Sequence, residues 1–158
     1  MNELTHFDAE GASRMVDVGD KQVTVRAARA SGRVRMRPET LELVRDRKLA
    51  KGDVLEVARL AAVMAAKRTD ELIPLCHSLP LNAVAVSFGF PDERTIAVEA
   101  EARATARTGV EMEALVAVSL AALTIYDMCK SVDREIVVEQ VRLEEKSGGR
   151  SGHFRRQS

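Results

Sequence analysis

The stretch AVAVSFGFPDERTIAVEAEARATAR, residues 83–107, decides the fold. Apolar and polar side chains alternate along both of its halves, with apolar residues at Val84, Val86, Phe88, Ile96 and Val98. Alternation with a period of two is typical of strands that bury one face, and Pro91-Asp92-Glu93 between the halves is typical of a turn. We therefore predict two strands, 83–90 and 95–107, that form an antiparallel hairpin.

The segments around this hairpin predict the other elements. They are a strand at 21–36, a short helix that begins at Pro38, helices at 54–69 and 110–132, and a strand at 136–143. Residues 72–81 hold Pro74 and Pro80, so they predict a shaped loop. This order of elements favours an α+β fold, a ferredoxin-like sandwich with one added helix. Its antiparallel sheet would carry helices on one face, and a second subunit often covers the other.

Chain length and glycine placement predict the domain organisation. A length of 158 residues fits a single domain, 1–158. Residues 1–20 are polar and predict an extended or mobile arm, and the glycine-rich residues 146–158 predict a mobile tail. The polar, acidic start is not typical of a signal peptide. Charged residues interrupt the apolar run after Val110, so we expect no membrane span and a cytoplasmic protein.

Composition argues against several functional classes. Basic and acidic side chains are equal at 24 each, and aromatic residues make up only 3% of the chain, which disfavours nucleic-acid binding. Cys76 and Cys129 do not make a disulfide framework. Three histidines and two cysteines lack the usual metal-ligand spacing, so no metal is expected. No motif for a redox cofactor is present, and we expect no cofactor.

The helix at 110–132 carries the first candidate groups. Asp127 and Lys130 lie three residues apart and so share one helix face. A surface ion pair is the ordinary explanation, but the neighbouring residues are mostly apolar, which favours a site. Glu113 lies fourteen residues before Asp127, about 21 Å along the helix axis. If both residues serve one small substrate, a second copy of the chain must bring them together.

Two further segments are candidates. His77 lies in the proline-bounded loop LIPLCHSLP, where irregular backbone slightly favours a functional role over a structural one. The stretch KSGGRSG, residues 146–152, could surround a phosphate with main-chain N–H groups and two cations, although it is not a Walker A loop.

Several strings together resemble the MoaC family. In order, they are MVDV at Met15, KGDV at Lys51, AAKRT at Ala65, LIPLCH at Leu72, TGVEMEAL at Thr108, ALTIYDMCK at Ala122 and KSGGRSG at Lys146. They run over nearly the whole chain and are long enough to be specific. One departure is Ser78, where the family commonly has proline after LCH.

The resemblance implies a ferredoxin-like subunit in a homohexamer, a trimer of dimers, with active sites between subunits. It implies a lyase of molybdenum cofactor biosynthesis. The substrate would be 3′,8-cyclo-7,8-dihydroguanosine 5′-triphosphate, and the products cyclic pyranopterin monophosphate and pyrophosphate. A radical-SAM GTP cyclase would supply the substrate.

The resemblance also implies roles for individual residues. Asp127 would be catalytic with Lys130 beside it, and we count Lys51 and His77 as further catalytic candidates. The candidate substrate-binding residues are Leu75, Cys76, His77, Met112, Glu113, Lys67 and Lys146. General acids and bases with phosphate-neutralising cations suffice in kind for ring rearrangement and phosphate cyclisation.

Two questions stay open on the sequence alone. A nearby Asp127 favours the charged form of Lys130, so either burial makes Lys130 a base or Lys130 is the acid and Asp127 the base. An RNA-binding module or a regulatory ligand-binding domain on the same fold is the alternative class. The few aromatics on residues 83–90 disfavour the first, and the second would have no need for an acid–base pair.

Overall fold

Strand β1 (Thr24–Arg35) occupies the centre of the sheet in the computed structural model, which describes residues 5–157. Its side chains alternate between two faces because successive residues of a strand point in opposite directions. Ala28, Ala30 and Val34 are buried beneath the helices, whereas Arg33 and Arg35 are exposed on the opposite face. The small alanines leave room for a helix to lie close to the sheet.

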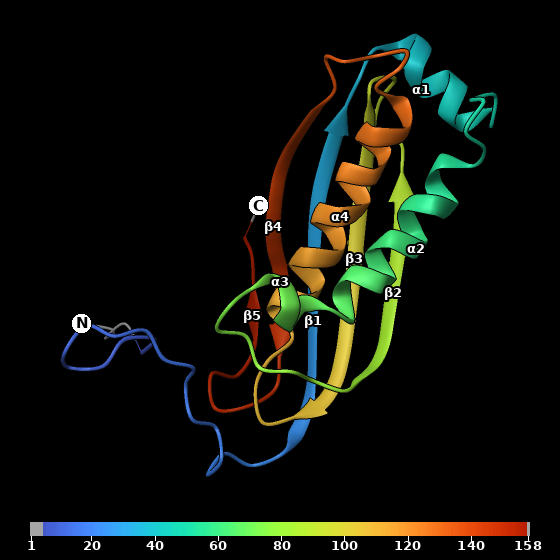
Figure 1. Ribbon diagram of the computed structural model, residues 1–158. Helices are drawn as coiled ribbons and strands as arrows, with labels where there is room; N and C mark the ends of the chain where they lie inside the picture. The colour runs from blue at the N-terminus through green and yellow to red at the C-terminus, as the bar shows by residue number, and fades with distance from the viewer. Residues whose placement is uncertain (1–4, 158) are drawn as a thin grey trace.

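Five strands and four helices make up the described chain (Figure 1). The other strands are β2 (Leu81–Gly89), β3 (Thr95–Ala106), β4 (Val137–Ser147) and β5 (Phe154–Arg155). The helices are α1 (Pro38–Arg45), α2 (Val54–Ala66), α3 (Thr69–Leu72) and α4 (Glu111–Cys129). The sheet has the order β2-β3-β1-β4-β5, and every neighbouring pair is antiparallel.

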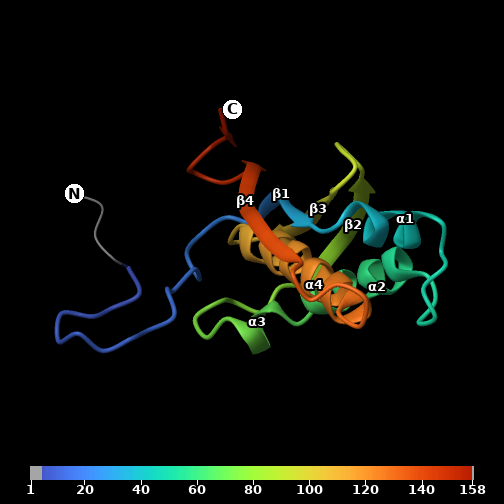
Figure 2. The same cartoon turned by 90° about the horizontal axis from the view of Figure 1, so that it is seen from above.

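The helices lie on one face of this sheet, as the view from above shows (Figure 2). This arrangement confirms the predicted α+β, ferredoxin-like sandwich and its antiparallel hairpin, in which Val86 pairs with Ala100. The additional helical segments are α1 and α3, which flank α2 along the chain.

Helix α4 forms the centre of the core. Its apolar residues include Val118 and Ile125, both fully buried, and several alanines that let it approach α2 and β1 closely. Gly32 of β1 is part of this contact, since a Cβ atom there would lie 2.7 Å from Val118 Cγ1.

By length and composition α4 could cross a membrane, but 56% of its most apolar stretch is buried inside the protein, as in a core helix.

The C-terminal segment contains an element that the sequence did not predict. Strand β4 continues to Ser147 because Lys146 and Ser147 pair with β1, four residues beyond the predicted end. The chain then turns at glycines with positive φ, and Phe154 pairs with Lys146 to begin β5. The predicted mobility of this tail stays a prediction.

The N-terminal arm extends away from the sheet (Figure 1). Among residues 5–20 a single bridge joins Phe7 to Ser13, and the arm then returns to the body of the protein near Val16. The mobility predicted for the arm likewise stays a prediction, and residues 1–4 of it lie outside the described residues.

Candidate active site

A cavity of about 270 Å³ lies where the loop 73–80 meets the beginning of α4. The loop contributes Leu75, Cys76 and His77, and the helix contributes Met112 and Glu113. These five residues are candidates named from the sequence, and the fold brings them to one place. The arm lines the same cavity through Val16 and Val18, together with Lys21 just before β1.

His77 is held in this cavity by the N-terminal arm. Its Nε2 lies 2.6 Å from the main-chain oxygen of Val16. A carbonyl oxygen only accepts hydrogen bonds, so Nε2 carries the proton in this contact and the other ring nitrogen, Nδ1, is left for other partners. The neighbouring Ser78, where the sequence departs from the family pattern, is exposed.

Glu113 is the buried acid of the cavity, with 4% of its surface exposed. Burial raises its pKa from 4.5 to about 7, and the nearby charges of Glu111 and Asp70 add to the increase. Glu113 is therefore poised to take up or release a proton near neutral pH. Burial also raises the pKa of the Cys76 thiol, which makes it a poor nucleophile and leaves it a packing role.

Lys146 reaches the edge of the same cavity through an ion pair. Its Nζ lies 2.8 Å from Oε1 of Glu111, a residue that lines the cavity from the first turn of α4. Sequence reasoning did not identify Glu111, because nothing local links it to a strand 35 residues away. Lys67 instead lines a neighbouring cavity of about 340 Å³ that shares Leu79 with the first.

The second group of candidates lies at the opposite end of α4. Nζ of Lys130 donates a hydrogen bond of 2.6 Å to Oδ1 of Asp127. This bond lowers the pKa of Asp127 and raises the pKa of Lys130, so the pair favours a carboxylate and an ammonium. Lys51, from the α1–α2 connection, donates to the main-chain oxygen of Asp127 over 3.1 Å.

In the single chain the Asp127–Lys130 pair is exposed, with 64% and 51% of the side chains accessible. The apolar neighbours that favoured a site in the sequence, such as Ile125 and Cys129, face the core. They therefore do not bury the pair. Within residues 5–157 the pair stays largely open to solvent.

Asp133 anchors the segment that follows Lys130. Its buried carboxylate accepts hydrogen bonds from the main-chain N–H groups of Arg37 (2.9 Å) and Glu135 (3.1 Å) and from the Thr40 hydroxyl (3.1 Å). The beginning of α1 is thereby tied to the end of α4. Sequence reasoning missed Asp133 because its partners on α1 lie more than 90 residues away.

Glu113 and Asp127 are separated by fourteen residues of one continuous helix, about 21 Å along its axis. One small substrate therefore cannot contact both groups within a single chain.

Within residues 5–157 no three His, Cys, Asp or Glu side chains gather closely enough to hold a metal ion. The chemistry that the described groups offer is proton transfer and binding of negative charge.

The fold and these two clusters define the protein as a ferredoxin-like α+β enzyme with acid–base groups at both ends of its central helix. The chain belongs to the MoaC family, whose model matches residues 15–149. It is 63% identical to "Cyclic pyranopterin monophosphate synthase" of Chloroflexus aurantiacus over 157 residues, 98% of this chain and 96% of that protein. Proteins of the same name from Magnetococcus marinus and Brevibacillus brevis are 60% and 52% identical, each over 98% of this chain and 95% and 97% of their own lengths.

Proposed function

We propose that this protein is the cyclic pyranopterin monophosphate synthase of molybdenum cofactor biosynthesis. The observation that carries the proposal is the match to synthases of that name, 52–63% identical over nearly the full length of both chains. The reaction is the conversion of 3′,8-cyclo-7,8-dihydroguanosine 5′-triphosphate into cyclic pyranopterin monophosphate and pyrophosphate. A radical-SAM GTP cyclase in the same cytoplasm would supply the substrate.

Two chemical tasks follow from this reaction. Rebuilding the guanine ring into a pterin requires proton transfers to and from ring nitrogen and carbonyl groups, which acids and bases near neutral pKa accelerate. Glu113, with a pKa of about 7, suits this task at one end of α4, and His77 lines the same cavity. Forming the cyclic phosphate requires a sugar hydroxyl to attack the α-phosphorus while pyrophosphate leaves, and cations stabilise the developing charge.

The proposal assigns opposite proton-transfer roles to Asp127 and Lys130. Because the hydrogen bond between them favours carboxylate and ammonium, Asp127 acts as the base and Lys130 as the acid. It is one of the two assignments that the sequence left open. Lys51 adds a third charge to the group and further lowers the pKa of Asp127.

The separation of the two clusters supports a shared active site. In our proposal the Asp127 end of one chain meets the His77 cavity of a neighbouring chain in a homohexamer, a trimer of dimers. The exposed pair and the His77 cavity are the two surfaces that this contact would join. The exposed face of the sheet gives the subunits a further surface on which to pack.

Incubation of the purified protein with the cyclised GTP derivative tests the reaction. We expect a fluorescent pterin after oxidation and one pyrophosphate for each substrate consumed. Pyrophosphate release without a pterin, or no conversion at all, would reject the proposed activity.

A further inference from the structure

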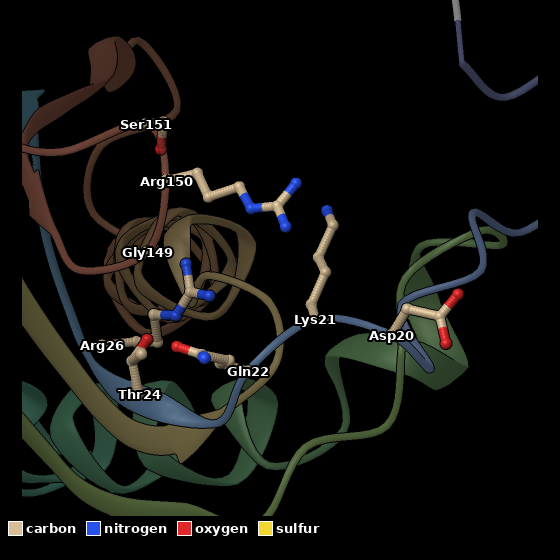
Figure 3. Close-up of a pocket in the computed structure, with 8 residues that line it drawn as sticks. All are labelled: Asp20, Lys21, Gln22, Thr24, Arg26, Gly149, Arg150 and Ser151. Atoms are coloured by element: carbon tan, nitrogen blue, oxygen red, sulfur yellow. The ribbon is translucent and has the colours of Figure 1, made fainter.

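The cations at the two ends of α4 are held in different ways. At the His77 end, Arg26 lines a cavity of about 660 Å³ and is 9% exposed, and Figure 3 shows its guanidinium beside Gly149. Two main-chain oxygens accept hydrogen bonds from this guanidinium, at 3.1 and 3.3 Å, and fix its place. At the Asp127 end, Lys51 is exposed on the α1–α2 connection, so its place depends on how that connection is held.

The α1–α2 connection takes its position from α1. Three successive N–H groups of the connection donate to carbonyl oxygens in the second half of α1, and they belong to Asp46, Arg47 and Lys48. A turn closed by the bond from Gly52 N–H to the Leu49 oxygen follows, and the Asp53 carboxylate then caps α2. A change in the position of α1 therefore moves the residues before Lys51, while Asp53 holds those after it.

Asp133 holds the beginning of α1. Its carboxylate, buried with the residue 2% exposed, accepts hydrogen bonds from the Arg37 N–H just before α1 and from the Thr40 hydroxyl in the first turn. The Arg37 guanidinium adds a second link, because it donates to the main-chain oxygen of Val132 and lies 3.6 Å from the Asp133 carboxylate. The Asp133 N–H itself donates to the oxygen of Cys129, the last residue of α4. This one residue thus joins the end of α4 to the beginning of α1.

The Asp133 carboxylate stays ionised near neutral pH. Burial disfavours the ionised form, but the hydrogen bonds to the carboxylate outweigh this cost, and the pKa of Asp133 lies below its ordinary value. A carboxylate that is already ionised and already accepts several hydrogen bonds is a poor source or receiver of protons. What it offers the protein is a fixed connection between two segments.

We propose that Asp133 is a positioning residue: by fixing α1 against the end of α4, it holds the Lys51 ammonium beside Asp127. The inference rests on the proposed function, in which Asp127 is the base. Asp133 holds the beginning of α1, the end of α1 holds the connection, and the connection carries Lys51 to within 3.1 Å of the Asp127 main-chain oxygen.

The direction of a pH shift tests this role. The charged groups that lower the pKa of Asp127 are Lys130, on the same helix, and Lys51. If Asp133→Asn releases Lys51, the pKa of Asp127 rises, and the acidic limb of the kcat/KM profile moves to higher pH. If Asp133 acted only through its own negative charge, the same substitution would lower the pKa of Asp127 and move the limb to lower pH. We expect the move to higher pH, with kcat lowered by about 10- to 100-fold, as when a reacting group is misplaced.

A double-mutant cycle tests whether Asp133 acts through Lys51. Lys51→Ala should cause a smaller fold-loss of kcat/KM in the Asp133→Asn background than in the wild type, because the ammonium is already displaced there. Arg37→Ala removes the second link through a half-exposed side chain and should move the acidic limb in the same direction, so the test does not depend on one variant folding.

Glu144→Gln is the matched control. Glu144 is another largely buried carboxylate that accepts hydrogen bonds from a hydroxyl, that of Ser31, and from an arginine, Arg142, but it lies on β4. This variant should keep the wild-type rate and pH profile. Equal fold-losses from Lys51→Ala in the wild-type and Asp133→Asn backgrounds would overturn the proposal, as would an acidic limb that stays in place or moves to lower pH.

Hydrogen exchange of the intact protein, followed by mass spectrometry without substrate, separates failure of this proposal from failure of the proposed function. Asp133→Asn should speed amide exchange in residues 38–52, and Glu144→Gln should not. If the wild type makes no pterin but exchange follows this pattern, the function is wrong and the anchoring of α1 by Asp133 stands. If the wild type makes pterin and Asp133→Asn keeps its rate and its pH profile, the positioning role is wrong and the function stands.

Discussion

Lys51 and Asp127 lie 76 residues apart in the sequence, yet the Lys51 ammonium donates a 3.1 Å hydrogen bond to the main-chain carbonyl of Asp127. The bond joins the α1–α2 connection to the last turn of α4. It also places a third charge beside the Asp127–Lys130 pair, and this charge contributes to the lowered pKa of Asp127.

Replacing Lys51 by alanine is therefore expected to move the acidic limb of the pH–rate profile. Asp127 works as a carboxylate, and removal of the Lys51 charge raises the pKa of Asp127. As the pH is lowered, the variant should therefore begin to lose activity at a higher pH than the wild type does. Lys48→Ala removes a lysine three residues earlier that pairs with Asp46, and it serves as the matched control. Profiles of kcat/KM against pH that coincide for Lys51→Ala and wild type would refute this coupling.

The Asp127–Lys130 pair should be essential for turnover and dispensable for folding. We expect Asp127→Asn and Lys130→Ala each to lower kcat by about 10²–10⁴-fold, the usual loss of a general acid or base. Thermal unfolding should change little, because both side chains are exposed. Asp46→Asn disrupts another exposed ion pair, with Lys48, and should keep wild-type activity. Wild-type kcat in either Asp127→Asn or Lys130→Ala would exclude the assigned roles.

Glu113 should make the protein less stable as pH rises from 4.5 to 7. The pKa of Glu113 is about 7 in the folded protein and 4.5 in the unfolded chain. Between these pH values the unfolded chain ionises first, which stabilises it relative to the folded state. Above pH 7 the full cost is present, roughly 3 kcal/mol at about 1.4 kcal/mol for each pKa unit. Glu113→Gln should therefore raise the free energy of unfolding at pH 8 and leave it little changed near pH 4.5. Denaturant unfolding at both pH values measures the difference, and a gain that is the same at both would contradict the raised pKa.

Gly32 should tolerate no side chain, because the contact between β1 and α4 is already close. A Cβ at this position meets Val118 Cγ1 at 2.7 Å, so Gly32→Ala is expected to cost about 1–3 kcal/mol of unfolding free energy. Gly89→Ala in β2 is the control, since its Cβ would have its nearest neighbour, Ala97 Cβ, at 4.0 Å. Equal stabilities of the two variants in urea would show that the helix moves away at little cost.

Local patterns account for what could be predicted of the fold. Alternation in 83–107 predicted the hairpin, and helical spacing predicted α2 and α4, because each pattern is a property of neighbouring residues. Strand β5 was missed because two residues show no period, and its pairing depends on turns at Gly148 and Gly149.

The candidate site was likewise predicted only where local motifs mark its residues. The residues of the His77 cavity were named from their motifs, but the ion pair of Glu111 with Lys146 and the buried Asp133 were not predicted. These contacts join segments that are far apart in the sequence, so no local signal carries them. The exposure of Asp127 and Lys130 was also unexpected, since apolar neighbours along a helix do not reveal which face they occupy.

Mixing two inactive variants tests most directly whether the active site lies between chains. One variant carries Asp127→Asn and the other His77→Ala, and the two are unfolded together, refolded and compared with each variant refolded alone. If one chain supplies Asp127 and its neighbour supplies His77, random assembly leaves about a quarter of the sites with both intact groups, so about a quarter of wild-type activity should return. Activity of the mixture no higher than that of the separate variants would contradict the shared site.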